Sequence, residues 1–328
     1  MRELKILAVV VFFSSLTYYL VEPFAHHAMH IKLDKNGNEI HIESNHFNYT
    51  GKSDIEEAKR KGDKNLIATK EKFWASVSKV ASLKGDAKKG EAGFGMCMGC
   101  HNGTDMNMGG VIPPKLDKAG SIYDKNYLIA LIKNPAMASN IDHKYKDTAL
   151  HPMASVSSMF TSDQSIADVV AFILAKKSAE ITPKEAYTDA CMRCHAVRYG
   201  KLTQLGDVPR FKHKKDEFAY KIKVIEEQDR VKAYMGNLPP DLSIMIRARS
   251  EHFLETFIQN PQSQLHGTSM PRVGLSKDGY EKVLKYLEEV GDPSKPKREK
   301  LAPFVLGFFI IFTLLAYLWK RSLWRDLH

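Results

Sequence analysis

The 328-residue chain has only four cysteines, and it lacks the short motifs that mark nucleotide-binding and hydrolytic enzymes. It contains no glycine-rich phosphate loop, no G-x-S-x-G nucleophile elbow and no H-E-x-x-H zinc motif, so those enzyme classes have no support. Four cysteines are also too few for a disulfide framework in a chain of this length. Acidic residues are outnumbered, because 48 Lys and Arg against 38 Asp and Glu give a net charge of +10.

Long hydrophobic runs are scarce as well, which excludes a transporter with many membrane spans. Two uncharged stretches stand out, at residues 6–21 and 301–319, and the chain between them is polar and rich in lysine. With 44% hydrophobic residues the chain can still build packed cores, so it is not wholly disordered. We therefore expect a water-soluble body of about two domains, held to a membrane at both ends.

The four cysteines all fall into two copies of the pattern C-x-x-C-H. The residues of the two copies are Cys97, Cys100, His101, Cys191, Cys194 and His195. This pattern is the attachment signature of c-type haem, in which both thiols bond to the haem and the histidine becomes the proximal iron ligand. The sequence therefore predicts two covalently bound haem c groups.

Two other uses of paired cysteines fit this sequence less well. A thioredoxin-like redox motif does not require a histidine after both pairs. One structural zinc shared by both pairs would place them roughly 12–20 residues apart. Here Cys97 and Cys191 are 94 residues apart.

Both ends of the chain predict membrane anchors. Arg2 and Lys5 precede the N-terminal uncharged stretch, which is short enough to be a secretory signal. The small residues that cleavage requires are poorly placed after it, so we favour an uncleaved anchor over residues 1–22. The C-terminal stretch is close to the ~20 residues that cross a bilayer, and basic residues follow it, as in a cytoplasmic tail.

The haem motifs also predict the side of the membrane. Haem is attached to C-x-x-C-H outside the cytoplasm, so we expect residues 22–300 in the periplasm. The protein would then lie in the inner (cytoplasmic) membrane, with both termini in the cytoplasm.

The two haem motifs belong to two copies of a longer pattern. Each motif is followed by Pro-Pro, at Pro113 and Pro239, and 21 residues later by Asn-Pro, at Asn134 and Asn260. Each copy then has a methionine and an amphipathic helix with apolar residues at i, i+3, i+4 and i+7. The apolar positions are Ile166, Val169, Val170 and Ile173 in the first copy, and Tyr280, Val283, Leu284 and Leu287 in the second. The pattern indicates a tandem duplication of one small helical domain.

This order of elements resembles class I cytochrome c. The resemblance implies a mainly α fold of two tandem cytochrome c domains, with an N-terminal and a C-terminal transmembrane helix. It also implies that a proline-loop carbonyl accepts the N–H of each proximal histidine. The candidates are Pro114 and Pro240, and the alternative is that both are ordinary turn prolines.

The same resemblance implies a methionine as the sixth iron ligand. Met270, which precedes a proline just before the last helix of its copy, is the candidate for the second haem. Met153 is the candidate for the first haem. The alternatives to Met153 are Met159, Met137 and His151.

The second copy resembles the cytochrome c1 subunit of bc-type quinol–cytochrome c reductases (complex III). The shared features are L-P-P-D-L-S at 238–243, R-A-R at 247–249, an insert after the haem motif and a C-terminal anchor. In that family an arginine of R-A-R lies near a haem propionate, which implies this role for Arg249, or else for Arg247. The alternative is a solvated surface arginine. The whole chain is similar to the dihaem cytochrome c subunit of some bacterial bc complexes.

We expect five parts along the chain. They are an N-terminal anchor (1–22), a periplasmic tether and helical segment (23–82), a first cytochrome c domain (83–180), a second, cytochrome c1-like domain (181–294), and a transmembrane helix with a cytoplasmic tail (295–328). Five histidines between residues 26 and 46 are interpreted as part of a polar tether, with a metal site as the alternative. Residues 53–83 are charged and helix-prone, and we expect this segment to open with a Ser53/Glu56 capping box and to turn Phe73 and Trp74 inward.

The resemblance implies electron transfer as the function. The expected partners are cytochrome b, a Rieske iron–sulfur protein as electron donor and a downstream cytochrome or terminal oxidase as acceptor, in a dimeric complex. We expect no independent catalytic residue and no nucleic-acid partner. The alternatives are the dihaem subunit of a haem–copper oxidase, a dihaem peroxidase with an open axial position, and a quinol dehydrogenase with bis-histidine haems.

Overall fold

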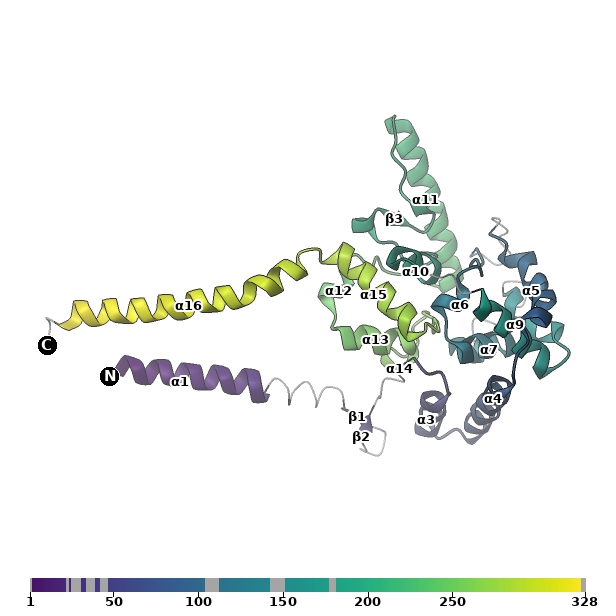
Figure 1. The fold of residues 1–328 in the computed structure, drawn as a ribbon, viewed down its shortest axis with the longest axis horizontal. Helices are drawn as coiled ribbons and strands as arrows, with labels where there is room; N and C mark the ends of the chain where they lie inside the picture. The colour runs from purple at the N-terminus through teal and green to yellow at the C-terminus, as the bar shows by residue number, and fades with distance from the viewer. Residues whose placement is uncertain are drawn as a thin grey trace. The chain divides into compact units, whose positions relative to one another are not determined.

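The fold is mainly helical in the computed structural model, which describes residues 2–21, 24, 31–33, 39–41, 47–103, 112–141, 151–176 and 181–325 (Figure 1). Most of the histidine-rich tether, including His26, His27, His30 and His46, lies outside these ranges. In the described ranges, strands occur only as two short antiparallel hairpins.

The elements up to residue 176 are α1 (Arg2–Leu16), the π-helix η1 (Thr17–Val21), β1 (Ile31–Leu33), β2 (Glu39–His41), α3 (Lys52–Lys61), α4 (Lys64–Ser82), α5 (Ala87–His101), α6 (Ala119–Ile122), α7 (Lys125–Lys133), α8 (Pro135–Ser139), the 3-10 helix η3 (Pro152–Met159) and α9 (Asp163–Ala175). The later elements are α10 (Pro183–Ala190), the 3-10 helix η4 (Arg198–Gly200), β3 (Leu202–Thr203), β4 (Gly206–Asp207), α11 (Lys214–Met235), α12 (Met245–Ala248), α13 (Glu251–Gln259), α14 (Pro261–Gln264), α15 (Lys277–Gly291) and α16 (Lys295–Trp324).

The chain divides into two compact units, and each unit draws on both halves of the sequence. Unit 1 consists of Met1–Met96, Tyr123–Ala175 and Glu255–Ser276. Unit 2 consists of Cys97–Ile122, Lys176–Leu254 and Lys277–His328. This division does not by itself show two tandem domains, so the boundaries at 83–180 and 181–294 stay a prediction.

Unit 1 has its core where α4, α7 and α9 meet. The four apolar positions predicted for one face of α9 are all buried, which confirms that helix face. Phe94 of α5 contacts Phe172 of α9 with ring centroids 5.0 Å apart. The two helices approach so closely that a Cβ on Gly90 would lie 2.0 Å from the carbonyl oxygen of Asp168. Glycine is therefore required at this crossing.

Unit 2 is built around α15, which packs on α10, α12 and α6. The four apolar positions predicted for one face of α15 are all buried, so this prediction is also confirmed. The rings of Tyr187 in α10 and Tyr286 in α15 lie 4.9 Å apart. The packing therefore brings α10, the helix before the second haem motif, against α15, the amphipathic helix of the second copy.

The repeated sequence pattern has a repeated local structure. The nine-residue helices α7 and α13 each end just before an Asn-Pro pair. In both copies the asparagine is the N-cap and the proline opens the next short helix, α8 or α14. Two segments with the same spacing thus form the same helix–cap–helix turn.

The charged segment before the first haem motif is helical, as predicted, and forms two helices, α3 and α4. The Ser53/Glu56 capping box was wrong, because Gly51 is the N-cap of α3 and makes no side-chain cap bond. Gly51 has a φ of 77°, and a Cβ there would lie 2.0 Å from the Trp74 ring. Trp74 is buried as predicted, whereas Phe73 is only half-buried.

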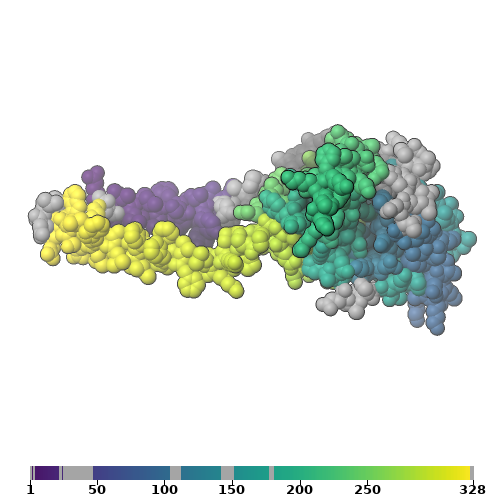
Figure 2. All heavy atoms as spheres, turned by 90° about the horizontal axis from the view of Figure 1, so that it is seen from above, coloured from purple at the N-terminus to yellow at the C-terminus, as the bar shows by residue number. Residues whose placement is uncertain are grey.

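Two described helices are long and apolar enough to cross a membrane, at Leu4–Val21 and Lys295–Trp324. Neither helix buries its apolar side chains; α16 is the yellow segment in Figure 2. Both coincide with the anchors expected from the sequence. Their topology in a membrane stays a prediction.

Candidate functional site

The first C-x-x-C-H motif forms the C-terminal end of α5. Cys100 and His101 follow Cys97 by three and four residues, so helical geometry places all three side chains on one face. Both cysteines are half-buried thiols outside any disulfide. The helix end therefore presents two sulfurs and an imidazole together, as attachment of one haem requires.

The ring of His101 is oriented by the proline loop. Its Nδ1 lies 2.6 Å from the carbonyl oxygen of Pro114. A carbonyl can only accept, so Nδ1–H donates, and the neutral ring keeps its lone pair at Nε2. Burial lowers the pKa of His101, the charge of Arg193 lowers it further, and the bond to Pro114 opposes both. The neutral, metal-binding form of the ring is thereby favoured.

The second motif forms a tight turn directly after α10. A capping box between Thr182 and Glu185 fixes the start of this helix. At its end the carbonyl of Cys191 accepts from the backbone N–H of Cys194 at 3.1 Å and of His195 at 2.9 Å. This turn gathers the motif's side chains over a short stretch of backbone, although it is not the regular helix of the first motif.

His195 makes the same contact as His101. Its Nδ1 lies 2.8 Å from the carbonyl oxygen of Pro240, so Nε2 again keeps the lone pair. Burial lowers the pKa of His195, against the opposing effects of the Pro240 bond and the Asp241 carboxylate. The Tyr187 hydroxyl donates to the His195 carbonyl at 3.0 Å and so fixes the backbone of this residue.

The L-P-P-D-L-S segment is what holds Pro240 in place. Asp241 Oδ2 accepts from the backbone N–H of Arg198 at 3.0 Å, and Ser243 Oγ accepts from that of Tyr199 at 3.1 Å. From the sequence, this segment was recognised only by its resemblance to cytochrome c1. Its polar side chains join the chain that follows His195 to the loop that carries Pro240.

The two methionine candidates and the two proximal histidines fall in different units. Met153 is the second residue of η3, and Met270 lies between α14 and α15; both are half-buried in unit 1, whereas the histidines belong to unit 2. The pairing of each histidine with its methionine therefore stays a prediction. Among the alternatives to Met153, Met159 is 54% exposed and His151 is buried.

The predicted propionate contact of Arg249 is also untested. Arg249 is exposed, and its guanidinium carbon lies 5.1 Å above the Phe253 ring. This cation–π contact fixes the direction of the side chain. Its role toward a haem stays a prediction.

Arg193 is a residue whose part in the site the sequence analysis missed. It lies inside the second C-x-x-C, and its Nε is buried with no hydrogen-bond partner in the part of the chain that the structure describes. A buried N–H of a charged group needs an acceptor, and a carboxylate suits a guanidinium best. A haem propionate is such a carboxylate, so this orphaned nitrogen fits a haem beside it. A charge within the motif was the signal that could have identified it.

The donor set fits haem attachment. Burial raises the pKa of Cys191 to about 12 and also raises that of Cys97 and Cys194, which favours neutral thiols. Thioether attachment of haem uses two thiols, and each motif offers two thiols and one Nε2 that keeps its lone pair.

Comparison with known proteins agrees with this chemistry. Residues 87–177, which include the first motif, match the family model for Cytochrome c. The chain is 21% identical over 190 residues to an ammonia monooxygenase gamma subunit of Nitrosomonas europaea, covering 44% of this chain and 81% of that protein. It is 22% identical over 204 residues to a cytochrome c1 of Allochromatium vinosum, covering 43% and 82%.

One solved structure, described as a hyperthermophilic respiratory Complex III, is 25% identical with a TM-score of 0.35. The match covers 44% of this chain and 75% of that one. The chain thus contains a cytochrome c domain, which implies covalently bound haem c, and it is related to cytochrome c1 at low identity.

Proposed function

We propose that this protein is a membrane-anchored dihaem cytochrome c, which carries electrons within a quinol–cytochrome c reductase. The observation that supports this most is the repeated geometry of the two motifs. In both, the proximal histidine donates Nδ1–H to the carbonyl of a Pro-Pro loop, at 2.6 Å from Pro114 and 2.8 Å from Pro240. This bond orients a metal-binding imidazole and increases its basicity.

Each residue of the two sites then has a simple task. A bound haem supplies reversible one-electron oxidation and reduction at its iron. His101 and His195 would hold the iron through Nε2, with Met153 and Met270 as the second protein ligands. Arg193 and Arg249 pair with propionates. No side chain has to move a proton for this function.

The partners follow from the cytochrome c1-like half of the chain. In this proposal the second haem receives the electron from a Rieske protein beside cytochrome b, and the first haem passes it to a downstream cytochrome or oxidase. Both termini are cytoplasmic, the body is periplasmic and the complex is dimeric. The net charge of +10 favours an acidic acceptor.

Gentle extraction of the tagged protein from native membranes, followed by mass spectrometry of co-purifying subunits, tests the proposal. We expect a cytochrome b and a Rieske protein, and cells with the untagged chain show the background. Recovery of copper-oxidase subunits alone would overturn the assignment to a reductase. The subunits of a monooxygenase would also overturn it, and would favour the function that the name of the Nitrosomonas europaea protein suggests.

A further inference from the structure

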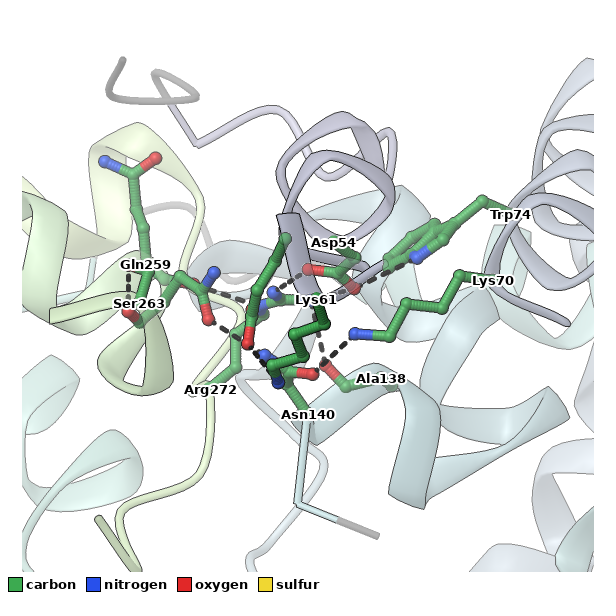
Figure 3. Close-up of polar contacts among 11 residues, drawn as sticks. Asp54, Lys61, Lys70, Trp74, Ala138, Asn140, Gln259, Ser263 and Arg272 are labelled. Atoms are coloured by element: carbon green, nitrogen blue, oxygen red, sulfur yellow. Dashed lines mark hydrogen bonds and ion pairs between the residues drawn. The ribbon is translucent and has the colours of Figure 1, made fainter. Parts of the chain in front are cut away.

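A buried ion pair in unit 1 joins the segment before the cytochrome c domain to the loop that carries Met270 (Figure 3). Arg272 donates to both carboxylate oxygens of Asp54, with Nη1 at 3.1 Å from Oδ2 and Nη2 bonded to Oδ1. The Trp74 Nε1–H also donates to Asp54 Oδ2, at 3.0 Å. The side chains of Arg272 and Asp54 are only 2% and 1% exposed.

Arg272 is held by its backbone as well as by its side chain. Its Nε donates to the Gln259 carbonyl at 3.0 Å, and its Nη1 also donates to the Ala138 carbonyl at 3.3 Å. Its backbone N–H donates to the Ser139 carbonyl at 3.0 Å. Its own carbonyl accepts from the Tyr127 hydroxyl at 2.7 Å. Hydrogen bonds therefore hold both the backbone and the side chain of Arg272 in place, which makes this residue a fixed point of unit 1.

Met270 lies two residues before this fixed point. On its other side the Thr268 carbonyl accepts from Gln262, and Thr268 Oγ1 accepts from the Met270 N–H at 3.3 Å. Pro271 restricts φ between Met270 and Arg272. The backbone at Met270 thus spans a short distance between two anchored residues, and release of Arg272 would free one of them.

The chemistry of the pair suits a positioning role. Removing two charges from water opposes their attraction, so a buried ion pair adds little net stability. A planar guanidinium bonded to both oxygens of a carboxylate does fix a direction in space. Asp54 and Trp74 come from α3 and α4, which lie outside the matched residues 87–177. The orientation of the loop that carries Met270 thus depends on helices α3 and α4, which precede the residues that match the family model.

We propose that Asp54 and Arg272 are positioning residues, which hold the Met270 loop so that the thioether binds the iron of the second haem. Met270 as that ligand belongs to the proposed function, on which this inference rests. Helices α3 and α4 then support the loop that carries Met270, in addition to packing within unit 1.

Asp54→Asn in the full-length protein tests this, because it keeps the side-chain volume and removes the charge. We expect one of the two sulfur-to-ferric charge-transfer bands to weaken or disappear and the midpoint potential of the second haem to fall. Imidazole should bind the ferric protein about tenfold more tightly, because a loosely held methionine competes less well. Two haems per chain and an unchanged potential of the first haem would distinguish this from general unfolding.

Glu57→Gln is the matched control, since Glu57 lies one turn along the same helix and pairs with Lys61 at 2.8 Å. It should keep both bands and both potentials. If Asp54→Asn does not accumulate, Trp74→Phe removes one bond to Asp54 and should give a smaller change in the same direction. Wild-type bands, potentials and imidazole affinity in a folded variant would overturn the positioning role.

Met270→Ala distinguishes a failure of the ligand assignment from a failure of the positioning role. If Met270→Ala keeps both bands, the ligand assignment in the proposed function is wrong, and the positioning role fails with it. If Met270→Ala loses one band while Asp54→Asn behaves as wild type, only the positioning role is wrong.

Discussion

The position of one hydrogen decides what each motif histidine can bind. Because Pro114 and Pro240 offer only carbonyl acceptors, both rings carry the hydrogen at Nδ1 and leave Nε2 free. A donor in place of either carbonyl would reverse the tautomer and put the lone pair on the wrong nitrogen. The two prolines therefore matter for their carbonyls as much as for the turn that they form.

We predict that the denatured protein retains two haems, measured as a pyridine haemochrome equivalent to two per polypeptide. Thioether bonds survive unfolding, whereas axial ligation alone does not. Replacing Cys191 and Cys194 by serine should leave one haem, and replacing Cys97 and Cys100 should leave the other. A single haem in the unmodified chain would contradict this prediction.

How much of this site could be predicted from the sequence depends on how local each contact is. The cysteines and histidines are recognisable because their spacing is a chemical requirement. The contacts of Asp241 and Ser243 were not predicted, because they join residues 43 and 44 positions apart through backbone groups that carry no sequence signal. Arg193 was missed because its burial depends on packing.

At the scale of elements, periodic patterns predicted helix faces better than helix ends. The buried faces of α9 and α15 follow from apolar residues at helical spacing. The start of α3 at Gly51 depends on the Trp74 ring packed against it, a contact between positions 23 residues apart. Gly62, with a φ of 69°, ends α3, and the Asp63 side chain caps α4. Local propensity alone did not distinguish one helix from two.

We predict that the Asp54–Arg272 pair makes unit 1 acid-labile. Burial raises the pKa of Asp54, but the charge and hydrogen bonds of Arg272, with Lys70 and Trp74, outweigh burial and hold this pKa below its usual 3.8. A carboxylate with a lowered pKa stabilises the fold above its unfolded pKa and loses that effect as the pH falls through the folded value. The free energy of unfolding should therefore fall as the pH drops below about 4.

Chemical denaturation between pH 7 and pH 2 measures this effect. Asp54→Asn should remove that part of the pH dependence. At pH 7 it should cost about 3–5 kcal/mol, because it leaves a buried guanidinium without its partner. A variant whose stability follows the wild-type profile in parallel would contradict the assignment.

At the scale of the whole molecule, the two apolar helices were predictable because each is one continuous run of sequence. The composition of the two units was not predictable in this way. Unit 1 combines residues 123–175 with 255–276, and no local pattern marks a contact between segments so far apart.

We predict that either apolar helix alone holds the protein in the membrane. Replacing residues 1–22 by a cleavable secretion signal, or deleting residues 301–328, should leave the chain in the membrane fraction after a carbonate wash. Both changes together should release it, because no spanning segment of about 20 apolar residues then remains. If the C-terminal deletion alone releases the protein, the N-terminal helix is a cleaved signal.

The Asp54–Arg272 pair also has a consequence for biosynthesis, because its partners are 218 residues apart in the chain. At about 5–20 residues per second, roughly 10–40 s pass between the synthesis of Asp54 and that of Arg272. Cys97 and Cys191 are both made within that interval. The Met270 loop therefore cannot be anchored by Asp54 until both cysteine pairs have been synthesised. Formation of this ion pair is thus a late event in the folding of unit 1, because most of the chain must exist before its two partners can meet.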